Sequence, residues 1–402
     1  MIKHIYTYFS YSILNSSLAL ATFSILARSV EVYEFGIIGI FLSILYFIIP
    51  VVILNTIGLV GINYTKMNDS DFQRFANNFF SMAILSSIVV FIFCLITIFI
   101  FPEYLFSILL IPFIALIITV NSFDDAVSIQ KNDSKRHGKH IFISRIGILL
   151  LTLLFVFFLK LSWSYYILSI LLAEFISLMF RIDNGFSHIK RYQYEFKKEY
   201  RIEFFRYGMP LFFLLAAGWS LNNADRFIVL EFFNLESVAM YVAAYQIGMA
   251  VNLINQSITN GTVSTIYQSI HDKKDTMLLI NKYLKIFAIF YFFIAIVVYI
   301  TFPVIVPLIF GAQYLDSIGI SILIALAFIF NGLYRLPSLV IDFLKKNTLK
   351  AWITAVAALL NIILSILLID FYGLLAPAYG TIYSHIFLIV VVYFASKRLL
   401  SK

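Results

Sequence analysis

The sequence predicts an all-α, polytopic membrane protein with about twelve transmembrane helices in two six-helix halves. Hydrophobic residues make up 62% of the 402 residues, charged residues make up only 12%, and the mean hydropathy is +0.95. About a quarter of the residues of a typical soluble protein are charged, so this chain has too few charges for a solvated surface. Apolar stretches recur along the chain, and basic residues collect between them. Lipid is therefore expected to be its main solvent.

Twelve stretches have the length and apolarity that a transmembrane helix needs, which is about twenty residues for a hydrocarbon layer of roughly 30 Å. Each is expected to be helical, because lipid offers the backbone no hydrogen-bond partners. The predicted spans are residues 7–27, 35–59, 77–101, 104–123, 141–159, 162–180, 207–230, 237–266, 279–301, 318–341, 351–369 and 373–396.

Lysine and arginine are unevenly distributed over alternate connections. If both termini are inside, 23 of the 29 Lys and Arg residues lie on the inner side and three on the outer side. The other three lie within the predicted spans. The positive-inside rule therefore predicts cytoplasmic termini. This placement explains the net charge of +8 as a topology signal, and no nucleic-acid partner is expected.

The longest connection, residues 181–206, is basic and aromatic and lies on the inner side. It is expected to be an amphipathic linker at the inner face. It would separate an N-terminal six-helix bundle, residues 1–180, from a C-terminal one, residues 207–402.

Two weak internal similarities indicate that the six-helix unit is duplicated. Phe101-Pro102 at the end of the third span recurs as Phe302-Pro303 at the end of the ninth, and residues 33–38 have a counterpart in residues 236–241. A duplicated unit with a substrate site between its halves is a common plan among transporters.

Polar side chains concentrate in the first two spans of each half. They line a hydrated cavity, or they form hydrogen bonds between helices; the sequence leaves both open. The candidates for contact with a substrate are Asn222, Asn223, Asn252, Asn255, Gln256 and Asn260.

Charged side chains within or near the spans are further candidates. Arg28, Arg145, Arg226 and Arg335 either hold an anionic substrate or reach to the interface and anchor the helices there. Three acids are also candidates: Asp124, Glu174 and Asp225. Each either pairs with a cation or carries a coupling proton. For Asp124 and Glu174 the expected cations are Arg145 and Arg335. Asp225 need not pair with Arg226, because neighbouring helical residues point about 100° apart.

No constellation for catalysis is visible. The only cysteine is Cys94, the six histidines lack metal-ligand spacing, and no P-loop or nucleophile elbow occurs. We expect no enzyme activity, no cofactor and no metal. A polytopic polysaccharide polymerase or ligase is disfavoured by the short outer connections, and a major-facilitator carrier by the loop GINYTKMNDSDFQRF, residues 61–75, which lacks the basic motif of that class.

Four segments resemble the polysaccharide repeat-unit (O-antigen, Wzx-like) flippases. They are ILARSVEVYEFGIIG (residues 25–39), DRFIVLEFFNLESVAMYVAAYQI (225–247), IFGAQYLDS (309–317) and FYGLLAPAYGTIYS (371–384). The resemblance covers both halves, and that family belongs to the superfamily that also contains multidrug exporters and the lipid II flippase.

The resemblance implies a fold of two six-helix bundles in the bacterial inner membrane. It also implies that the protein flips an undecaprenyl-diphosphate-linked oligosaccharide by alternating access. The expected partners are the lipid bilayer, that substrate, and the polymerase and chain-length proteins of the same polysaccharide. A multidrug or small-solute exporter of the same superfamily remains the alternative.

Overall fold

The computed structural model describes residues 2–272 and 275–401, and the side chains of residues 10–272 and 275–401. In this part of the chain every regular element is helical. Twelve helical segments are long and apolar enough to cross a membrane, and each contains or overlaps one predicted span. The predicted fold class is therefore confirmed.

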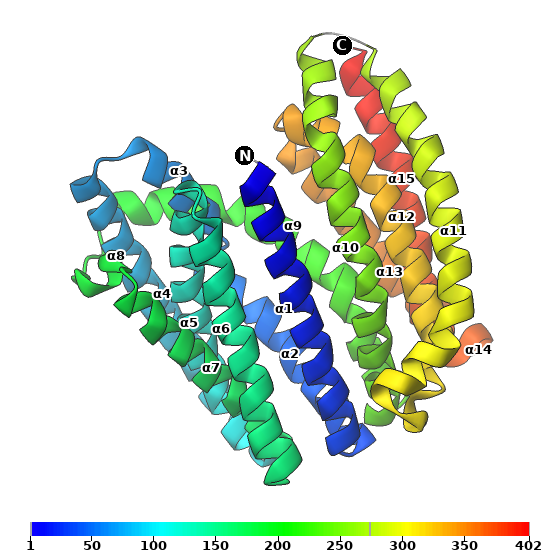
Figure 1. The fold of residues 1–402 in the computed structure, drawn as a ribbon, viewed down its shortest axis with the longest axis horizontal. Coiled ribbons are helices and arrows are strands. Elements are labelled where there is room, and N and C mark those ends of the chain that lie inside the picture. The colour runs from blue at the N-terminus through cyan, green and yellow to red at the C-terminus, as the bar shows by residue number, and fades with distance from the viewer. Residues whose placement is uncertain (1, 273–274, 402) are drawn as a thin grey trace. The chain divides into compact units, whose positions relative to one another are not determined.

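The chain forms two compact units, and the first comprises Met1–Val30 and Phe41–Phe212. In this unit α5 lies between α4 and α7, and α6 contacts α1 and α7 (Figure 1). A π-helical turn, η2 (Leu153–Phe158), extends α6. Its elements are α1 (Ile2–Ser29), most of α2 (Val32–Val52), α3 (Ile57–Lys66), α4 (Asp69–Ile100), α5 (Leu105–Gln130), α6 (Ser134–Thr152), α7 (Ser164–Asp183), α8 (Ser187–Lys190) and the first part of α9 (Lys198–Phe232).

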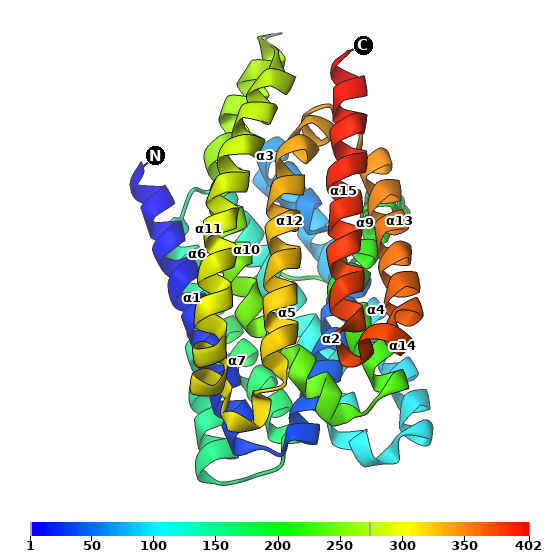
Figure 2. The same cartoon turned by 90° about the vertical axis from the view of Figure 1, so that its right-hand side faces the viewer.

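The second unit comprises Glu31–Ile40 and Phe213–Lys402. Here α12 contacts α10, α11 and α15, and α13 lies against α15 (Figure 2). Its elements are the start of α2, the rest of α9, α10 (Leu235–His271), α11 (Thr276–Phe310), α12 (Ser317–Phe343), α13 (Asn347–Leu367), α14 (Ile369–Tyr372) and α15 (Ala376–Leu400).

Residues 31–40 belong to the second unit because the start of α2 lies very close to the start of α10. A Cβ atom at Gly36 would collide with the backbone carbonyl of Leu235, and one at Gly39 would collide with Val242. Only glycine permits backbones to approach this closely.

The second predicted span, residues 35–59, is not one continuous helix. It breaks between α2 and α3, where Leu54 and Asn55 have positive φ angles of 49° and 55°. Pro50 lacks the N–H that continues a helix, and the N–H of Asn55 donates to the Pro50 carbonyl at 2.9 Å. The two Phe-Pro motifs are not in equivalent places. Phe302-Pro303 lies within α11, which continues to Phe310, whereas Phe101-Pro102 follows the last residue of α4.

The connection after α7 is more ordered than a loop. Backbone N–H groups of alternate residues donate to side chains of α4, namely Gln193 to Asn77 at 3.2 Å, Glu195 to Ser81 at 3.1 Å and Lys197 to Asn78 at 2.7 Å. We call residues 184–197 the strap. Residues 198–206, expected in the linker, form the first turns of α9.

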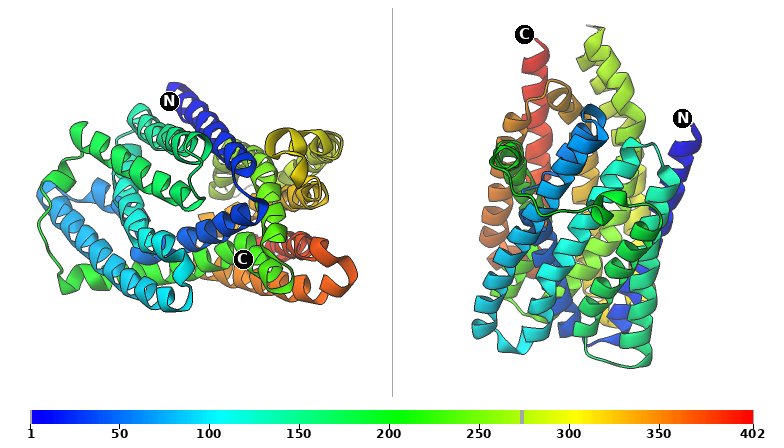
Figure 3. Two further views of the ribbon diagram at one scale, coloured as in Figure 1. Left: turned by 90° about the horizontal axis from the view of Figure 1, so that it is seen from below. Right: turned by 90° about the vertical axis from the view of Figure 1, so that its left-hand side faces the viewer.

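The first turns of α9 lie nearly perpendicular to the neighbouring helices of the first unit. In Figure 1 they run across the page whereas α4, α5 and α7 run up it, and in the right panel of Figure 3 they are seen nearly end-on. This direction is typical of a helix in the plane of a membrane interface.

Candidate functional site

Asp225 is the centre of a buried polar cluster in the second unit. Its side chain on α9 is fully buried, which means that it has no contact with solvent or lipid. Tyr245 of α10 donates a short hydrogen bond to Asp225 Oδ2, and Thr381 Oγ1 of α15 lies 3.0 Å from the same oxygen. With its amide nitrogen turned toward the carboxylate, Asn361 of α13 donates to Oδ1 at 3.2 Å. Four helices therefore converge on one carboxyl group.

Among the residues that the structure describes, no cation forms an ion pair with this carboxyl group. Arg226 points elsewhere, since its Nη1 donates to Asn223 Oδ1 at 2.8 Å and its guanidinium lies 5.4 Å from the centre of the Tyr245 ring. A buried carboxylate without an ion pair is costly in a membrane unless it binds a proton or a small cation. Asp225 therefore has the surroundings expected of a coupling-ion ligand.

A narrow gap lies beside the cluster. It is bounded by Asn222, Tyr245, Ile324, Ala327, Phe328, Thr381 and His385. His385 Nδ1 is 2.8 Å from the Thr381 carbonyl oxygen, and Asn222 donates to the Gly218 carbonyl at 2.7 Å. The gap is too narrow for a sugar, so the cluster has no room for an oligosaccharide.

Arg335 forms a second polar group in this unit. Its Nη2 donates to Asn252 Oδ1 at 2.7 Å and its Nε donates to Asn331 Oδ1 at 3.1 Å. Both acceptors are neutral amides, and no acidic side chain pairs with Arg335 within the described residues. The guanidinium is thus held in place while its charge is not compensated, which is the arrangement expected of an anion-binding arginine.

Beside Arg335, one face of α10 is polar and open. Asn252 is half-buried, and the polar side chains that follow at helical spacing, Gln256, Asn260 and Ser264, are exposed. Exposed amides within a transmembrane helix favour a hydrated space over contact with lipid.

Asn255, a further candidate for contact with a substrate, does not share this open face. It is fully buried, its Nδ2 donates to the Phe328 carbonyl at 2.7 Å, and its Oδ1 accepts a hydrogen bond from Tyr291. One residue of sequence rotates a side chain by about 100°, which turns Asn255 into the helix bundle. It holds α10, α11 and α12 together.

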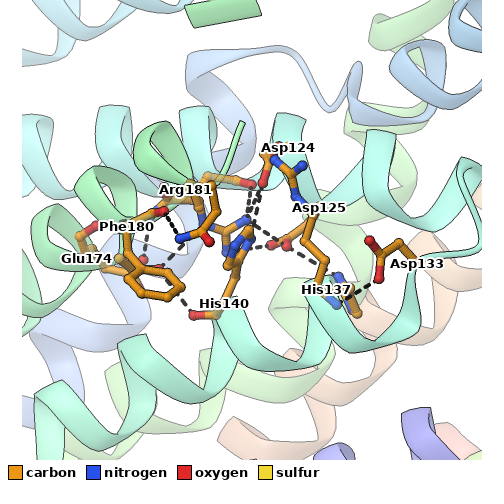
Figure 4. A network of polar contacts seen from close by, with 12 residues as sticks. Asp124, Asp125, Asp133, His137, His140, Glu174, Phe180 and Arg181 are labelled. Carbon is orange, nitrogen blue, oxygen red and sulfur yellow. Dashed lines mark hydrogen bonds and ion pairs between the residues drawn. The ribbon is translucent and has the colours of Figure 1, made fainter. Parts of the chain in front are cut away.

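In the first unit, Asp124 and Asp125 of α5 bind cations of α6 and α7 (Figure 4). Arg181 of α7 makes a bidentate contact with Asp125 at 2.8 and 3.2 Å, and its Nη1 lies 3.3 Å from Asp124. Arg136 donates to the other oxygen of Asp124 at 2.8 Å. His140 Nδ1 is 3.2 Å from Asp124. Asp124 was expected to pair with Arg145 or Arg335, and that choice of partners is wrong. Because Asp124 pairs with Arg136 and Arg181 instead, it is a poor candidate for carrying a proton.

Glu174 lies on α7 and is joined to this network through Asn121, whose carbonyl accepts from Arg181 (Figure 4). Its carboxylate accepts from Asn121 Nδ2 at 2.8 Å and from Ser144 Oγ at 2.6 Å, which are neutral donors. No ion pair of Glu174 is found in the described part of the chain. Of the two candidate acids in this unit, Asp124 and Glu174, the better candidate for carrying a coupling proton is thus Glu174.

The two remaining candidate arginines are Arg145 and Arg28. Arg145 on α6 is half-buried and makes no hydrogen bond or ion pair with any described residue, whereas Arg28 near the end of α1 is exposed. Arg145 therefore resembles Arg335 in having a charge that no acid compensates.

Comparison with known proteins identifies the family. Residues 25–319, more than half of the chain, match the family described as polysaccharide biosynthesis protein. The chain belongs to this family. None of the curated proteins matches it significantly.

The fold of this polysaccharide biosynthesis protein is shared with solved transporters. An inward-facing multidrug resistance MATE family transporter of the MOP superfamily is 14% identical, with a TM-score of 0.78 over 96% of this chain and 94% of that chain. The lipid II flippase MurJ in an inward closed conformation is 16% identical, with a TM-score of 0.75 over 97% and 87%. At such identities the likeness establishes the fold alone.

Three important residues of these clusters were not singled out from the sequence. Asn361 and Thr381 complete the Asp225 cluster, and Arg181 was counted among the linker cations. A survey of every polar residue within an apolar run would have found Asn361. The position of Arg181 gave no such signal, because it lies at the charged end of its helix.

The open face of α10 can be tested with cysteines in a Cys94→Ala background. We expect Gln256→Cys and Asn260→Cys to react with a membrane-impermeant thiol reagent several-fold faster than Asn255→Cys, which is the matched control on the same helix. Protection of all three cysteines would show that the face is covered, and the hydrated space would be abandoned.

Proposed function

We propose that this protein flips an undecaprenyl-diphosphate-linked oligosaccharide, an O-antigen or similar repeat unit, across the bacterial inner membrane by alternating access. The proposal is supported by the family and by the shared fold with MurJ, which is described as a lipid II flippase. Both termini would lie in the cytoplasm. The polymerase and chain-length proteins of the polysaccharide would act next.

The observation that carries the proposal is Arg335. A lipid-linked oligosaccharide presents an anionic diphosphate beside a polar sugar chain. Within the described residues, the Arg335 guanidinium donates to the amides of Asn252 and Asn331 and to no acid, and the exposed amides of Gln256 and Asn260 follow along α10. The guanidinium would bind phosphate oxygens in a bidentate manner, and the amides would bind sugar hydroxyls. Arg145 is the second candidate for the diphosphate.

The test compares Arg335→Lys and Arg335→Ala in a strain whose surface polysaccharide depends on this protein. Hydrogen bonds to charged groups contribute about 1.5–3 kcal/mol each, so losing one lowers binding by about tenfold to a hundredfold. We expect both variants to lose surface polysaccharide and to accumulate lipid-linked repeat units at normal membrane abundance. The same pair of substitutions at Arg145 tests the second cation.

Lys285→Arg is the matched control. Lys285 is an exposed residue of α11, and a lysine that reaches to the interface needs only a long stem and a charge. Normal polysaccharide in the alanine variants of Arg28, Arg145, Arg226 and Arg335 would contradict binding of the diphosphate by arginine. If deletion of the protein changed drug susceptibility and left polysaccharide intact, the exporter alternative would be supported instead.

A further inference from the structure

The strap and the first turns of α9 carry a dense group of exposed cations. We call it the basic surface, and all six of its members are exposed: Lys190, Arg191, Lys197, Lys198, Arg201 and Arg206. It lies on the side that the excess of Lys and Arg assigns to the cytoplasm.

Two of the acids in the same segment are turned inward. Glu195 accepts from Asn78 Nδ2 of α4 at 3.1 Å, and Glu203 accepts from Asn63 Nδ2 of α3 at 3.2 Å. Glu199 is exposed. Lys197 lies 3.9 Å from Glu195, at the limit of an ion pair, and Arg191 pairs with Asp69 of α4 at 3.2 Å. The basic surface therefore presents a net positive charge, although the segment as a whole contains several acids.

The segment is firmly attached to the first unit. Besides the backbone bonds from the strap to α4, Phe186 and Phe204 are almost fully buried, and Phe204 lies 5.5 Å from the Phe75 ring. His188 Nδ1 is 2.9 Å from Gln73 Oε1, and burial lowers the pKa of this imidazole, so it is neutral at neutral pH. The charge of the surface therefore comes from its lysines and arginines.

Large apolar side chains are interspersed with the cations. Tyr194 is 64% exposed, Ile202 is 55% exposed and Phe205 is 52% exposed. Arg201 lies over the Phe196 ring, 4.9 Å from its centre. Because the first turns of α9 lie across the direction of α4 and α5 (Figures 1 and 3), this face is suited to the boundary between headgroups and acyl chains.

We propose that the basic surface is a docking site for anionic phospholipid headgroups of the cytoplasmic leaflet. The exposed apolar side chains enter the acyl boundary, and the lysines and arginines bind the headgroup phosphates. Charge complementarity selects this partner, since the cytoplasmic leaflet is negatively charged and attracts clustered basic residues. The strap makes the site rigid, so lipid binds to a preformed arrangement of cations.

The experiment measures lipid selectivity of the full-length protein in phosphatidylcholine vesicles with trace spin-labelled phosphatidylglycerol or phosphatidylcholine. We expect the wild type to associate preferentially with phosphatidylglycerol at low salt. A variant with Lys197→Gln, Lys198→Gln, Arg201→Gln and Arg206→Gln should lose at least half of that preference. The matched control carries Lys345→Gln, Lys346→Gln, Lys397→Gln and Arg398→Gln, four exposed cations of the second unit, and should keep it.

Equal loss in both variants would mean that net charge alone attracts the lipid. Wild-type selectivity in the first variant would mean that the lipid binds elsewhere. Either result overturns the proposal.

A second measurement uses Ile202→Cys in the Cys94→Ala background, labelled with a fluorophore. Lipids spin-labelled at the headgroup should quench it more strongly than aqueous iodide does. Preferential quenching by iodide would place this face in water and contradict docking.

Discussion

Replacing Arg181 with alanine is expected to lower the free energy of unfolding by about 3–5 kcal/mol, because it leaves buried acids without their main cation. Only 2% of the Arg181 side chain is exposed, and the guanidinium binds Asp124, Asp125 and the carbonyl of Asn121. Lysine should rescue little of the loss, since an ammonium group cannot make the bidentate contact with Asp125. The measurement is unfolding of the purified protein in mixed micelles by SDS titration, followed by circular dichroism.

Arg191→Ala is the matched control for this prediction. Arg191 also pairs with an aspartate, Asp69 at 3.2 Å, but their side chains are 58% and 79% exposed. An exposed pair contributes under about 1 kcal/mol, so the control should be nearly neutral. Adding Asp125→Asn to Arg181→Ala should restore part of the stability by removing a partly buried charge that has lost its bidentate partner. If Arg181→Ala were as stable as the control, the network would not contribute to the fold as we infer.

The transmembrane helices were predictable because composition alone indicates lipid as the solvent, and lipid permits few structures. The same approach misplaced the helix ends. Predicted spans stop at the first charges, whereas α6 begins at Ser134, α7 continues to Asp183 and α9 begins at Lys198. Helices continue through the interface, where charged residues are tolerated. The ion pairs of Arg136 and Arg181 form in these charged turns and were therefore hidden in predicted loops.

The site was predicted in part. From the sequence, Asn252 and Gln256 were placed on one face of α10 with Asn260 beside it, because periodicity determines which residues share a face. In the structure Gln256 and Asn260 are exposed. Periodicity could not show that Asn255 turns toward α12, since that depends on which neighbour lies beside each face. Asp225 was a candidate from its charge alone. Its partners Asn361 and Thr381 come from helices far away in sequence, and only the fold brings them together.

Replacing Asp225 with asparagine is expected to reduce surface polysaccharide to the level of a deletion strain while membrane abundance and thermal stability stay normal. Asparagine has nearly the same shape and keeps an oxygen that accepts from Tyr245 and Thr381. Its NH2 group replaces Oδ1 and can donate to the Asn361 oxygen once that amide turns, so the four-helix contact survives. It cannot bind a proton or a cation by charge, so coupling to an ion gradient would be lost. Replacing a buried charge with a neutral group should not destabilise the protein.

This prediction is checked by measuring lipid-linked repeat units and surface polysaccharide while the proton or sodium gradient is collapsed in separate cultures. Export by the wild type should fall in one of the two conditions, and the Asp225→Asn strain should show no further fall. Asp342→Asn is the control, because Asp342 is a carboxylate of the same unit that already has a cation, Lys350 at 2.8 Å. It should retain export and its dependence on the gradient. Gradient-dependent export by Asp225→Asn would show that the coupling ion binds elsewhere. Glu174 would then be the next residue to replace, because its carboxylate also accepts from neutral donors, Asn121 and Ser144.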